Sequence, residues 1–470
     1  MSNHNNVVRS GLWYTVSTII VKGTVFISTP FFTRILSKTE YGDYNNYLSW
    51  VSIAIILVTL NFDSTMISAR YDYEKKYDNY CLTVSLYSLI SCVMWLIVLH
   101  TFQTQFEKIT GINKDFIYPI VIYLAFYGVI EIFLARCRIL FEYKQVAIIN
   151  IAIAVLSVGL AIILSLFLQD KLWAIVLGQI IPNIAVGTII CCIIIKKANR
   201  VIRAAWRYAL PICLPFIPHL LSMILLNAMD RIMIKKICGA EDTALYSVAY
   251  TCGYAVAVFM ISMNTAFCPW LGERINNKEY KEIRRFSYKY ITLFIYLLIG
   301  VLLVSPEMLM VLGGKKYMCA KNVIPPVAVG VAFQFLYTMF VNVEQITKKT
   351  WGMAFASISA AILNFCLNRA LIPAFGYEIA AYTTLLSYLW LLIVHMLFVV
   401  KIKYSFIYDY KFMVCVVVGL ILIMIGLSVL YNNTILRWII VAGYILLLLT
   451  LCVINRNKIM KMFVSENREG

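Results

Sequence analysis

Lys22 and His219 are ionisable residues that fall deep inside long apolar stretches of the sequence. Each is followed twelve residues later by an arginine, Arg34 and Arg231 respectively. A charge near the middle of a membrane span costs about 2.5 to 3.5 kcal/mol on translocon scales, so it needs a partner, an aqueous cavity or a function. The matched positions predict a cationic cavity that binds an anionic group. The alternative is that a carbonyl or carboxylate satisfies Lys22 locally and that His219 is an ordinary hydrogen-bonded core histidine.

Three acidic residues in the apolar stretches are candidates for ion coupling or gating. Glu131 lies seven residues before Arg138, so it could form a local ion pair or couple transport to a cation or a proton. Asp63 lies near the end of its stretch, where contact with interfacial water is the simpler interpretation. Asp230 precedes Arg231, and these opposite charges could gate a cleft or anchor their helix.

Fourteen apolar stretches, each about long enough to cross a bilayer, must position these residues. They predict an all-α integral membrane protein with fourteen transmembrane helices. The first stretch has no small-residue cleavage site, so we expect it to be retained. The predicted spans are 11–35, 45–67, 80–104, 116–137, 145–168, 172–195, 208–232, 243–270, 287–312, 322–345, 351–373, 377–400, 411–431 and 436–454.

The composition leaves no room for a soluble catalytic domain. Apolar residues make up 62% of the chain and charged residues only 14%, which is typical of a membrane bundle. The sequence has no Walker A loop, no HExxH or GxSxG motif and no Cys/His metal spacing, so we predict no enzyme, no cofactor and no metal site. Most of the 13 cysteines lie in apolar stretches and are expected to be free thiols.

The net charge of +18 is explained by the flanks of the spans, not by a nucleic-acid site. With the amino terminus placed inside, the cytoplasmic segments carry 27 Lys and Arg residues, against 13 on the opposite side. Because cytoplasmic flanks are enriched in positive charge, this excess predicts that both termini are cytoplasmic.

A duplication is visible around Arg34 and Arg231, which close similar segments 197 residues apart. Six spans separate the copies, so we predict two pseudo-twofold related six-helix lobes with two further helices appended. Pro211, Pro215 and Pro218 should kink the seventh span beside the cavity. The predicted parts are an N-lobe at 1–195, a basic linker at 196–207, a C-lobe at 208–400, and two helices with a cytoplasmic tail at 401–470.

Three segments carry patterns more specific than hydropathy: RILSKTEYGDY after the first span, Asp230-Arg231 followed by YSVAY, and N-x-x-x-N-x-x-L-I-P-x-F-G near residue 370. They resemble the polysaccharide transporters of the multidrug/oligosaccharidyl-lipid/polysaccharide (MOP) superfamily, which includes the Wzx-type repeat-unit flippases. The last pattern is followed by Ile-Ala-Ala where the family expects Gly-Ala-Ala. The motif residues expected to be structural are Tyr41, Gly42, Tyr44, Asn364, Asn368, Pro373 and Gly376.

The resemblance implies a MATE-like fold with two lobes around a cleft. It also implies that undecaprenyl-diphosphate-linked oligosaccharides cross the bacterial inner membrane by alternating access, for O-antigen, capsule or exopolysaccharide synthesis. The implied partners are that lipid-linked oligosaccharide, membrane lipids, Na⁺ or H⁺ as a coupling ion, and a polysaccharide polymerase. The alternatives are a MATE-type drug or cation antiporter, which would favour an acidic cavity, and a flippase for another lipid-linked cell-wall precursor.

Overall fold

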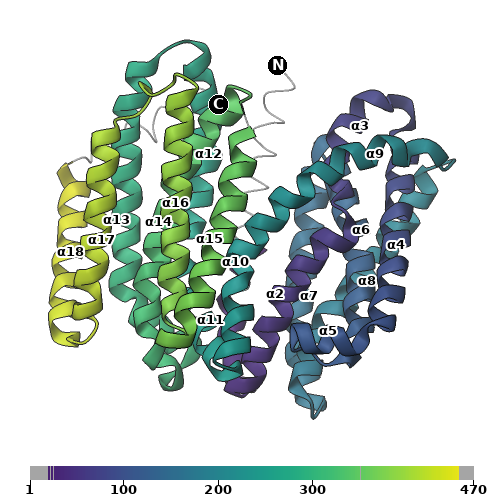
Figure 1. Ribbon diagram of the computed structural model, residues 1–470, viewed down its shortest axis with the longest axis horizontal. Helices are drawn as coiled ribbons and strands as arrows, with labels where there is room; N and C mark the ends of the chain where they lie inside the picture. The colour runs from purple at the N-terminus through teal and green to yellow at the C-terminus, as the bar shows by residue number, and fades with distance from the viewer. Residues whose placement is uncertain (1–19, 22, 25, 350, 455–470) are drawn as a thin grey trace.

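The computed structural model describes residues 20–21, 23–24, 26–349 and 351–454, which form a helical protein made of two bundles (Figure 1). Eleven of the described helical segments are long and apolar enough to cross a membrane, and one bent helix pair raises this number to twelve. A shorter apolar segment, Thr434–Thr450, follows them. The first predicted span lies partly outside the described residues. The prediction of an all-α membrane protein is confirmed.

The N-lobe is the bundle that contains the first half of the described chain. Residues 26–35 end a first helix, and Ser37 then caps the next helix together with Glu40 in a reciprocal capping box. The N-lobe elements are α2 (Lys38–Thr59), η1 (Phe62–Thr65), α3 (Met66–Asp72), η2 (Glu74–Lys76), α4 (Tyr77–Thr101), α5 (Gln103–Thr110), η3 (Lys114–Phe116), α6 (Ile117–Ile139), α7 (Tyr143–Phe167) and α8 (Lys171–Lys197).

A break divides the second predicted span, which the sequence suggested was continuous over 45–67. Leu60 and Asn61 adopt left-handed backbone angles, with φ of 54° and 53°, and the chain turns by 48° between α2 and the η1–α3 segment. Asparagine tolerates this conformation better than most residues, whereas leucine adopts it rarely. The turn brings Asp63 into η1 at the edge of the cavity described below.

The seventh predicted span is divided at its prolines and belongs to both lobes. It consists of α9 (Trp206–Cys213), η5 (Leu214–Phe216) and α10 (Ile217–Ile237). The buried side chains of Ala209 and Cys213 belong to the hydrophobic core of the N-lobe, and α9 packs against α4 and η1. The predicted boundary at residue 208 is therefore corrected: the chain crosses to the C-lobe only after η5, because the proline-rich turn lets two helices pack on different bundles.

The C-lobe contains the remaining helices, and its apolar core continues into buried residues of α2, α6 and α8 in the N-lobe. Its most buried span is Lys315–Ile346, in which 89% of the most apolar stretch lies inside the protein. The other helices surround it and expose aliphatic side chains on their outer faces. The C-lobe elements are α11 (Ala240–Tyr254), α12 (Ala257–Asn276), α13 (Tyr280–Gly313), η6 (Lys315–Val323), α14 (Ile324–Ile346), α15 (Trp351–Phe375), α16 (Ile379–Lys401), α17 (Tyr410–Leu430) and α18 (Thr434–Ile454).

The last two helices, α17 and α18, pack on the outside of the C-lobe against α14 and α13. Arg437 is buried and donates to the carboxylate of Glu307 and to the carbonyl oxygen of Leu303. Hydrogen bonds from Tyr288 and Arg284 hold the pKa of Asp409, in the loop before α17, below its usual value. This contact therefore persists at neutral pH and is lost only as the pH falls through that lowered pKa.

The two lobes meet at one end of the molecule along an interlobe seam formed by Gly42 and Asp43 of α2 with Lys235 and Ala240 of α10 and α11. A Cβ atom added to Gly42 would overlap the carbonyl oxygen of Ala240, so only glycine permits this approach. Lys235 and Asp43 form an ion pair across the seam.

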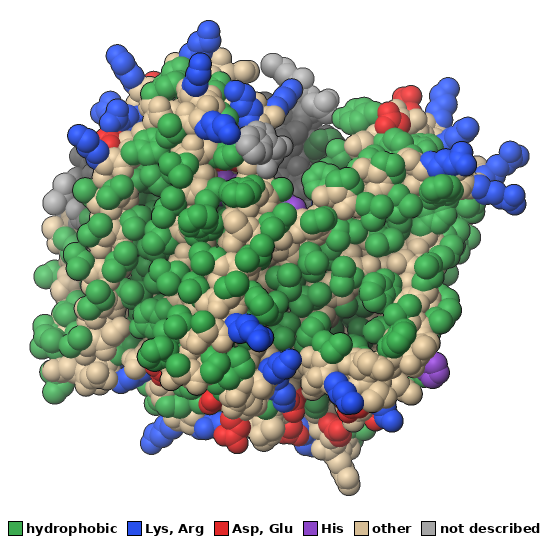
Figure 2. All heavy atoms as spheres, viewed as in Figure 1, with side chains coloured by type: hydrophobic (Ala, Val, Ile, Leu, Met, Phe, Trp, Pro, Cys, Tyr) green, Lys and Arg blue, Asp and Glu red, His purple; other side chains and the backbone are tan. Residues whose placement is uncertain are grey.

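At the opposite end, Lys and Arg side chains gather along the upper edge in Figure 2. This is the edge at which α12 meets α13 and α16 meets α17. The lower edge, where the seam lies, carries side chains of both signs. The positive-inside rule would place the upper edge in the cytoplasm and the seam on the outer side of the membrane.

Candidate functional site

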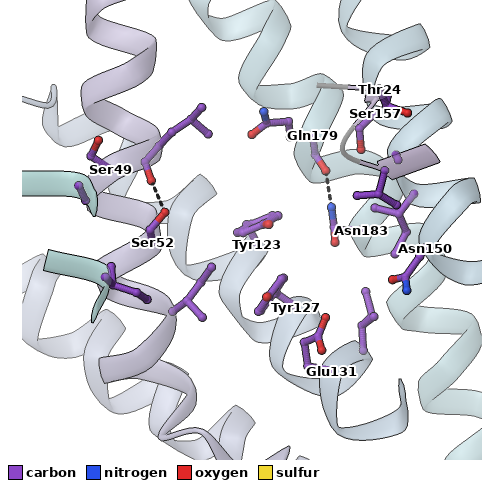
Figure 3. A pocket seen from close by; sticks show the side chains of 18 of the residues that line it. Thr24, Ser49, Ser52, Tyr123, Tyr127, Glu131, Asn150, Ser157, Gln179 and Asn183 are labelled. Carbon is purple, nitrogen blue, oxygen red and sulfur yellow. Dashed lines mark hydrogen bonds between the residues drawn. The ribbon is translucent and has the colours of Figure 1, made fainter. Parts of the chain in front are cut away.

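A cavity of about 930 Å³ lies mainly within the N-lobe and extends to the first two C-lobe helices. The N-lobe wall comes from the helix before α2 and from α2, η1, α6, α7 and α8, and the C-lobe wall comes from α10 and α11. Most of its lining is apolar, but hydroxyl and amide side chains project into it at every level (Figure 3). It is large enough for a ligand of several rings.

Polar residues on three N-lobe helices form one wall of this cavity. Tyr123, Tyr127 and Glu131 are spaced four residues apart on α6, so they occupy one helical face. Gln179 and Asn183 show the same spacing on α8, and the amide of Asn183 donates to the backbone oxygen of Gln179 at 2.8 Å. Asn150 and Ser157 face them from α7. This wall was not predicted from the sequence, although polar residues recur at helical spacing inside the apolar spans and could have indicated it.

Among the described arginines, Arg231 lines this cavity, from the C-lobe side. Its guanidinium donates to the backbone oxygen of Asn227 at 3.2 Å and lies 4.6 Å from the ring centre of Tyr250. It makes no ion pair with a described carboxylate, and its Nε is buried without a hydrogen-bond partner in the described part of the chain. A half-buried guanidinium with free donors is suited to bind an anion.

The other described cationic candidates, His219 and Arg34, do not line this cavity. Lys22 lies outside the described residues. His219 is not part of the cavity lining, and its Nδ1 lies 2.8 Å from the Oγ of Ser357 on α15. Arg34 is exposed and donates to backbone oxygens of Pro30 and Val311. The duplication therefore relates Arg34 and Arg231 in sequence without giving these two arginines the same surroundings.

Two of the predicted acidic residues, Asp63 and Glu131, line the cavity at the end away from the interlobe seam. Glu131 accepts a hydrogen bond from Arg138 at 3.4 Å, which is a weak contact. The predicted local ion pair is therefore present, but it leaves the carboxylate in the cavity wall. The described residues thus place negative charge at one end of the cavity and the unpaired Arg231 toward the other.

The third acidic residue, Asp230, is buried inside the C-lobe and its side chain is part of a polar cage. Its carboxylate accepts hydrogen bonds from Tyr246 and Thr384, both at 2.6 Å, and from Asn368 at 2.7 Å. Asn364 is a fourth, longer contact at 3.4 Å. These residues come from α10, α11, α15 and α16. Of the two roles considered from sequence, this position favours the anchor over the gate.

We predict that Asp230→Ala destabilises the folded protein by about 2 to 4 kcal/mol, because it leaves several buried donors without an acceptor. Thermal unfolding in detergent, followed by intrinsic fluorescence, measures the change. Glu241→Gln, exposed in the first turn of α11, is the matched control and should unfold like the wild type. Equal unfolding temperatures for Asp230→Ala and the control would show that the cage contributes no stability.

The motif residues have separate positions in the structure. Tyr41 and Tyr44 line the cavity, and the Tyr44 hydroxyl accepts a hydrogen bond from Gln179. Asn364 and Asn368, four residues apart on α15, both point to Asp230. Pro373 lies in the last turn of α15, and Gly376 ends that helix with φ of 75°, a left-handed conformation that favours glycine.

The described part of the chain contains no group of three or more His, Cys, Asp or Glu side chains that could hold a metal ion. The described lining of the cavity offers hydrogen-bond donors and acceptors, the unpaired Arg231 and the carboxylates of Asp63 and Glu131. Such a set can bind and release a polar ligand.

Solved structures with the same fold are transporters. The protein is similar to the lipid II flippase MurJ in an inward closed conformation, with a TM-score of 0.68 and 13% sequence identity over 95% of this chain and 99% of that chain. It is also similar to the MATE multidrug transporter DinF-BH, with a TM-score of 0.62 and 12% identity over 86% of this chain and 97% of that one. The protein therefore shares its fold with these two transporters.

The sequence comparisons identify the family. Residues 7–274 match the family described as Polysaccharide biosynthesis protein, and residues 215–369 match the family described as MatE. The chain belongs to the polysaccharide biosynthesis protein family. An uncharacterized membrane protein of Haemophilus influenzae is 21% identical over 377 residues, which cover 76% of this chain and 88% of that protein.

Proposed function

We propose that the protein is a flippase for undecaprenyl-diphosphate-linked oligosaccharide repeat units, used in surface polysaccharide synthesis. The observation that carries this proposal is the unpaired guanidinium of Arg231 in a cavity otherwise rich in hydroxyl and amide groups. A diphosphate needs a cationic, fork-shaped donor, and sugar hydroxyls pair with Asn, Gln, Ser and Tyr side chains. The prenyl chain can remain in the lipid while the headgroup crosses.

The proposed mechanism is alternating access by rocking of the two lobes. With the interlobe seam closed, the headgroup enters from the cytoplasmic leaflet, and its diphosphate contacts Arg231. Opening of the seam, which requires the separation of α2 from α11, releases the headgroup on the outer side of the bacterial inner membrane. The substrate drives this change only through different affinities for the two states.

The coupling ion is proposed to be Na⁺ or H⁺, acting at Asp63 and Glu131 in the cavity or at Asp230 in its cage. Glu131→Gln keeps the size of the side chain and removes its charge. We expect it to reduce the stimulation of transport by an imposed ion gradient while exchange without a gradient continues. Measuring transport with a Na⁺ gradient and, in a separate experiment, with an H⁺ gradient identifies the ion. If Glu131→Gln responded to both gradients as the wild type does, Glu131 would be excluded from coupling.

The direct test of the proposal is a reconstituted assay that measures the exposure of labelled lipid-diphosphate oligosaccharide on the far leaflet of proteoliposomes. The proposed function predicts translocation that depends on the protein and is competed by unlabelled substrate. Liposomes with the same amount of Arg231→Ala protein are the matched control. Wild-type translocation no faster than that of protein-free liposomes would overturn the proposal.

A drug or cation antiporter is the second candidate, because Asp63 and Glu131 make one end of the cavity acidic. An acidic cavity attracts cationic compounds. Export of a cationic dye from the same proteoliposomes, abolished by Glu131→Gln and insensitive to Arg231→Ala, would favour this function over the flippase. A flippase for another lipid-linked cell-wall precursor would require the same arginine. It would differ only in which unlabelled headgroup competes with the labelled substrate in the translocation assay.

A further inference from the structure

Five exposed cations lie close together on the basic linker, residues 196–207, which runs from the end of α8 to the start of α9. None of them forms an ion pair with a carboxylate that the structure describes. From sequence this stretch was predicted as a connection between the lobes, and nothing in the proposed transport cycle uses its charges. The five cations are Lys196, Lys197, Arg200, Arg203 and Arg207.

Three side chains of α4 hold the backbone of the linker against the N-lobe. The Oδ1 of Asn79 and the Oγ1 of Thr83 accept hydrogen bonds from backbone N–H groups of the linker, at 2.8 to 3.3 Å. The hydroxyl of Tyr87 donates to the backbone oxygen of Arg203 at 2.8 Å. The spacing of four residues puts these three side chains on one helical face. The linker is therefore fixed in place, and a site whose backbone is already ordered loses less entropy when it binds a ligand.

The neighbouring carboxylates of the N-lobe have other partners. Asp72 accepts a hydrogen bond from the hydroxyl of Tyr208 in α9, at 2.5 Å. Asp78, in the first turn of α4, forms an ion pair with the buried Arg136 at 2.7 Å. Glu74 of η2 is followed directly by two lysines, so η2 adds net positive charge to the same edge. The charge of the linker is thus not neutralised by the N-lobe.

The surroundings of these cations are those of a membrane surface. Trp206 and Val201 are 47% and 45% exposed, and the guanidinium carbon of Arg207 lies 5.3 Å from the ring centre of Trp206. Tryptophan is enriched at the boundary between membrane and water. Lys and Arg side chains gather at the upper right edge in Figure 2, beyond the start of α9 in Figure 1. The positive-inside rule places this edge at the cytoplasmic leaflet.

An anionic phospholipid headgroup is the partner that this surface fits. Guanidinium groups bind phosphate oxygens through paired hydrogen bonds. Anionic lipids of the cytoplasmic leaflet attract basic segments that lie next to membrane spans. The linker directly follows α8 and precedes the broken span of α9 and α10, so its side chains remain at the level of the headgroups.

We propose that the basic linker is a binding site for anionic phospholipid headgroups, in which Arg200, Arg203 and Arg207 contact the phosphate. The bound lipid holds the cytoplasmic edge of the N-lobe at the membrane surface. The first break in the chain after this edge is the proline-rich turn η5, so the C-lobe can move from α10 onward while the linker stays attached. Anionic lipid should therefore stimulate transport. That last step rests on the proposed function, whereas the lipid site does not.

The first test measures lipid binding without transport. Native mass spectrometry of the detergent-purified protein counts the phosphatidylglycerol molecules that it retains, with zwitterionic phosphatidylcholine as the comparison. The linker triple variant combines Arg200→Gln, Arg203→Gln and Arg207→Gln. It should bind phosphatidylglycerol at least about fivefold more weakly than the wild type, and it should retain phosphatidylcholine equally well.

The matched control removes three exposed charges from the C-lobe part of the same edge, between α12 and α13. This control triple variant combines Lys278→Gln, Lys281→Gln and Arg285→Gln, and it should bind phosphatidylglycerol as the wild type does. Equal losses in the two triple variants, or no loss in the linker triple variant, would overturn the proposal. In either case the basic linker would be no more than a part of the general positive charge of this edge.

A second variant tests the ordering of the backbone with all the charges in place. Asn79→Ala combined with Tyr87→Phe removes hydrogen bonds to the linker, so it should also weaken phosphatidylglycerol binding. Binding equal to that of the wild type would show that the linker is not a built site. Undecaprenyl diphosphate is added as a competitor. If it displaced phosphatidylglycerol from the wild type but not from the linker triple variant, the occupant would be the substrate headgroup and the phospholipid assignment would be wrong.

The effect on transport is measured in proteoliposomes made with and without phosphatidylglycerol. The wild type and the control triple variant should translocate the labelled lipid-diphosphate oligosaccharide several-fold faster with phosphatidylglycerol, and the linker triple variant should lose this stimulation. Equal stimulation in all three proteins would overturn the role of the lipid in transport. If the wild type moves no substrate in either membrane, the proposed function fails, while the binding measurements still decide whether the linker binds lipid.

Discussion

Gly42→Val is expected to prevent closure of the interlobe seam and to reduce transport by about ten- to a hundredfold. The added side chain would have to occupy the space taken by the carbonyl oxygen of Ala240. Overpacking of this kind costs about 1 to 3 kcal/mol, and the transporter can avoid the cost by keeping the seam open. Transport in proteoliposomes measures the loss.

Double electron–electron resonance spectroscopy tests the conformational part of this prediction. It measures the distance between one spin label on α2 and another on α11, in a protein whose native cysteines are replaced. Gly42→Val should shift the distribution of label-to-label distances to longer values. The distribution should also become narrower, because the seam is held open. Gly159→Val on α7 is the matched control, because that glycine has open space around its Cβ position. A closed seam in Gly42→Val would show that this glycine does not control the approach of the lobes.

Arg231→Ala is expected to reduce translocation of the lipid-diphosphate substrate by about a hundredfold. This factor corresponds to about 3 kcal/mol, the value of charge-assisted hydrogen bonds from one guanidinium to a diphosphate. Arg231→Lys keeps the charge but loses the fork-shaped donor geometry, so it should fall between the wild type and the alanine variant. The initial rate in the reconstituted assay is the measurement.

Lys236→Ala provides the control for charge removal on the same helix. Lys236 is exposed, five residues after Arg231, and does not line the cavity. It should transport at the wild-type rate. Similar losses in Lys236→Ala and Arg231→Ala would mean that the effect is one of general surface charge and not of a headgroup contact.

The helices were predictable because apolar length determines whether a segment can cross a bilayer. Each of the later predicted spans corresponds to a described helix or broken helix pair. The breaks were only partly predictable. Three prolines indicated the η5 turn, but the left-handed turn at Leu60 depends on how α2 and α3 pack against α6, and hydropathy does not record such contacts.

The candidate site was less predictable than the fold. A charge in an apolar span indicates that the side chain needs a polar environment, but not which helix supplies it. Asp230 was identified as unusual, yet its partners on α11, α15 and α16 come from distant parts of the chain. His219 was expected to face the cavity, but the break before α10 lets its ring contact α15 instead. Arg231, which the same sequence repeat indicated as a candidate, does line the cavity.

The central claim is that the anionic headgroup occupies the polar cavity beside Arg231. A cryo-electron microscopy map of the wild type bound to undecaprenyl-diphosphate-linked oligosaccharide measures this directly. We predict density for the diphosphate at about 3 Å from the guanidinium of Arg231, with the sugar rings against the polar wall of α6, α7 and α8. Density for the headgroup inside the C-lobe or on the lipid-facing surface, with the cavity empty, would contradict the account.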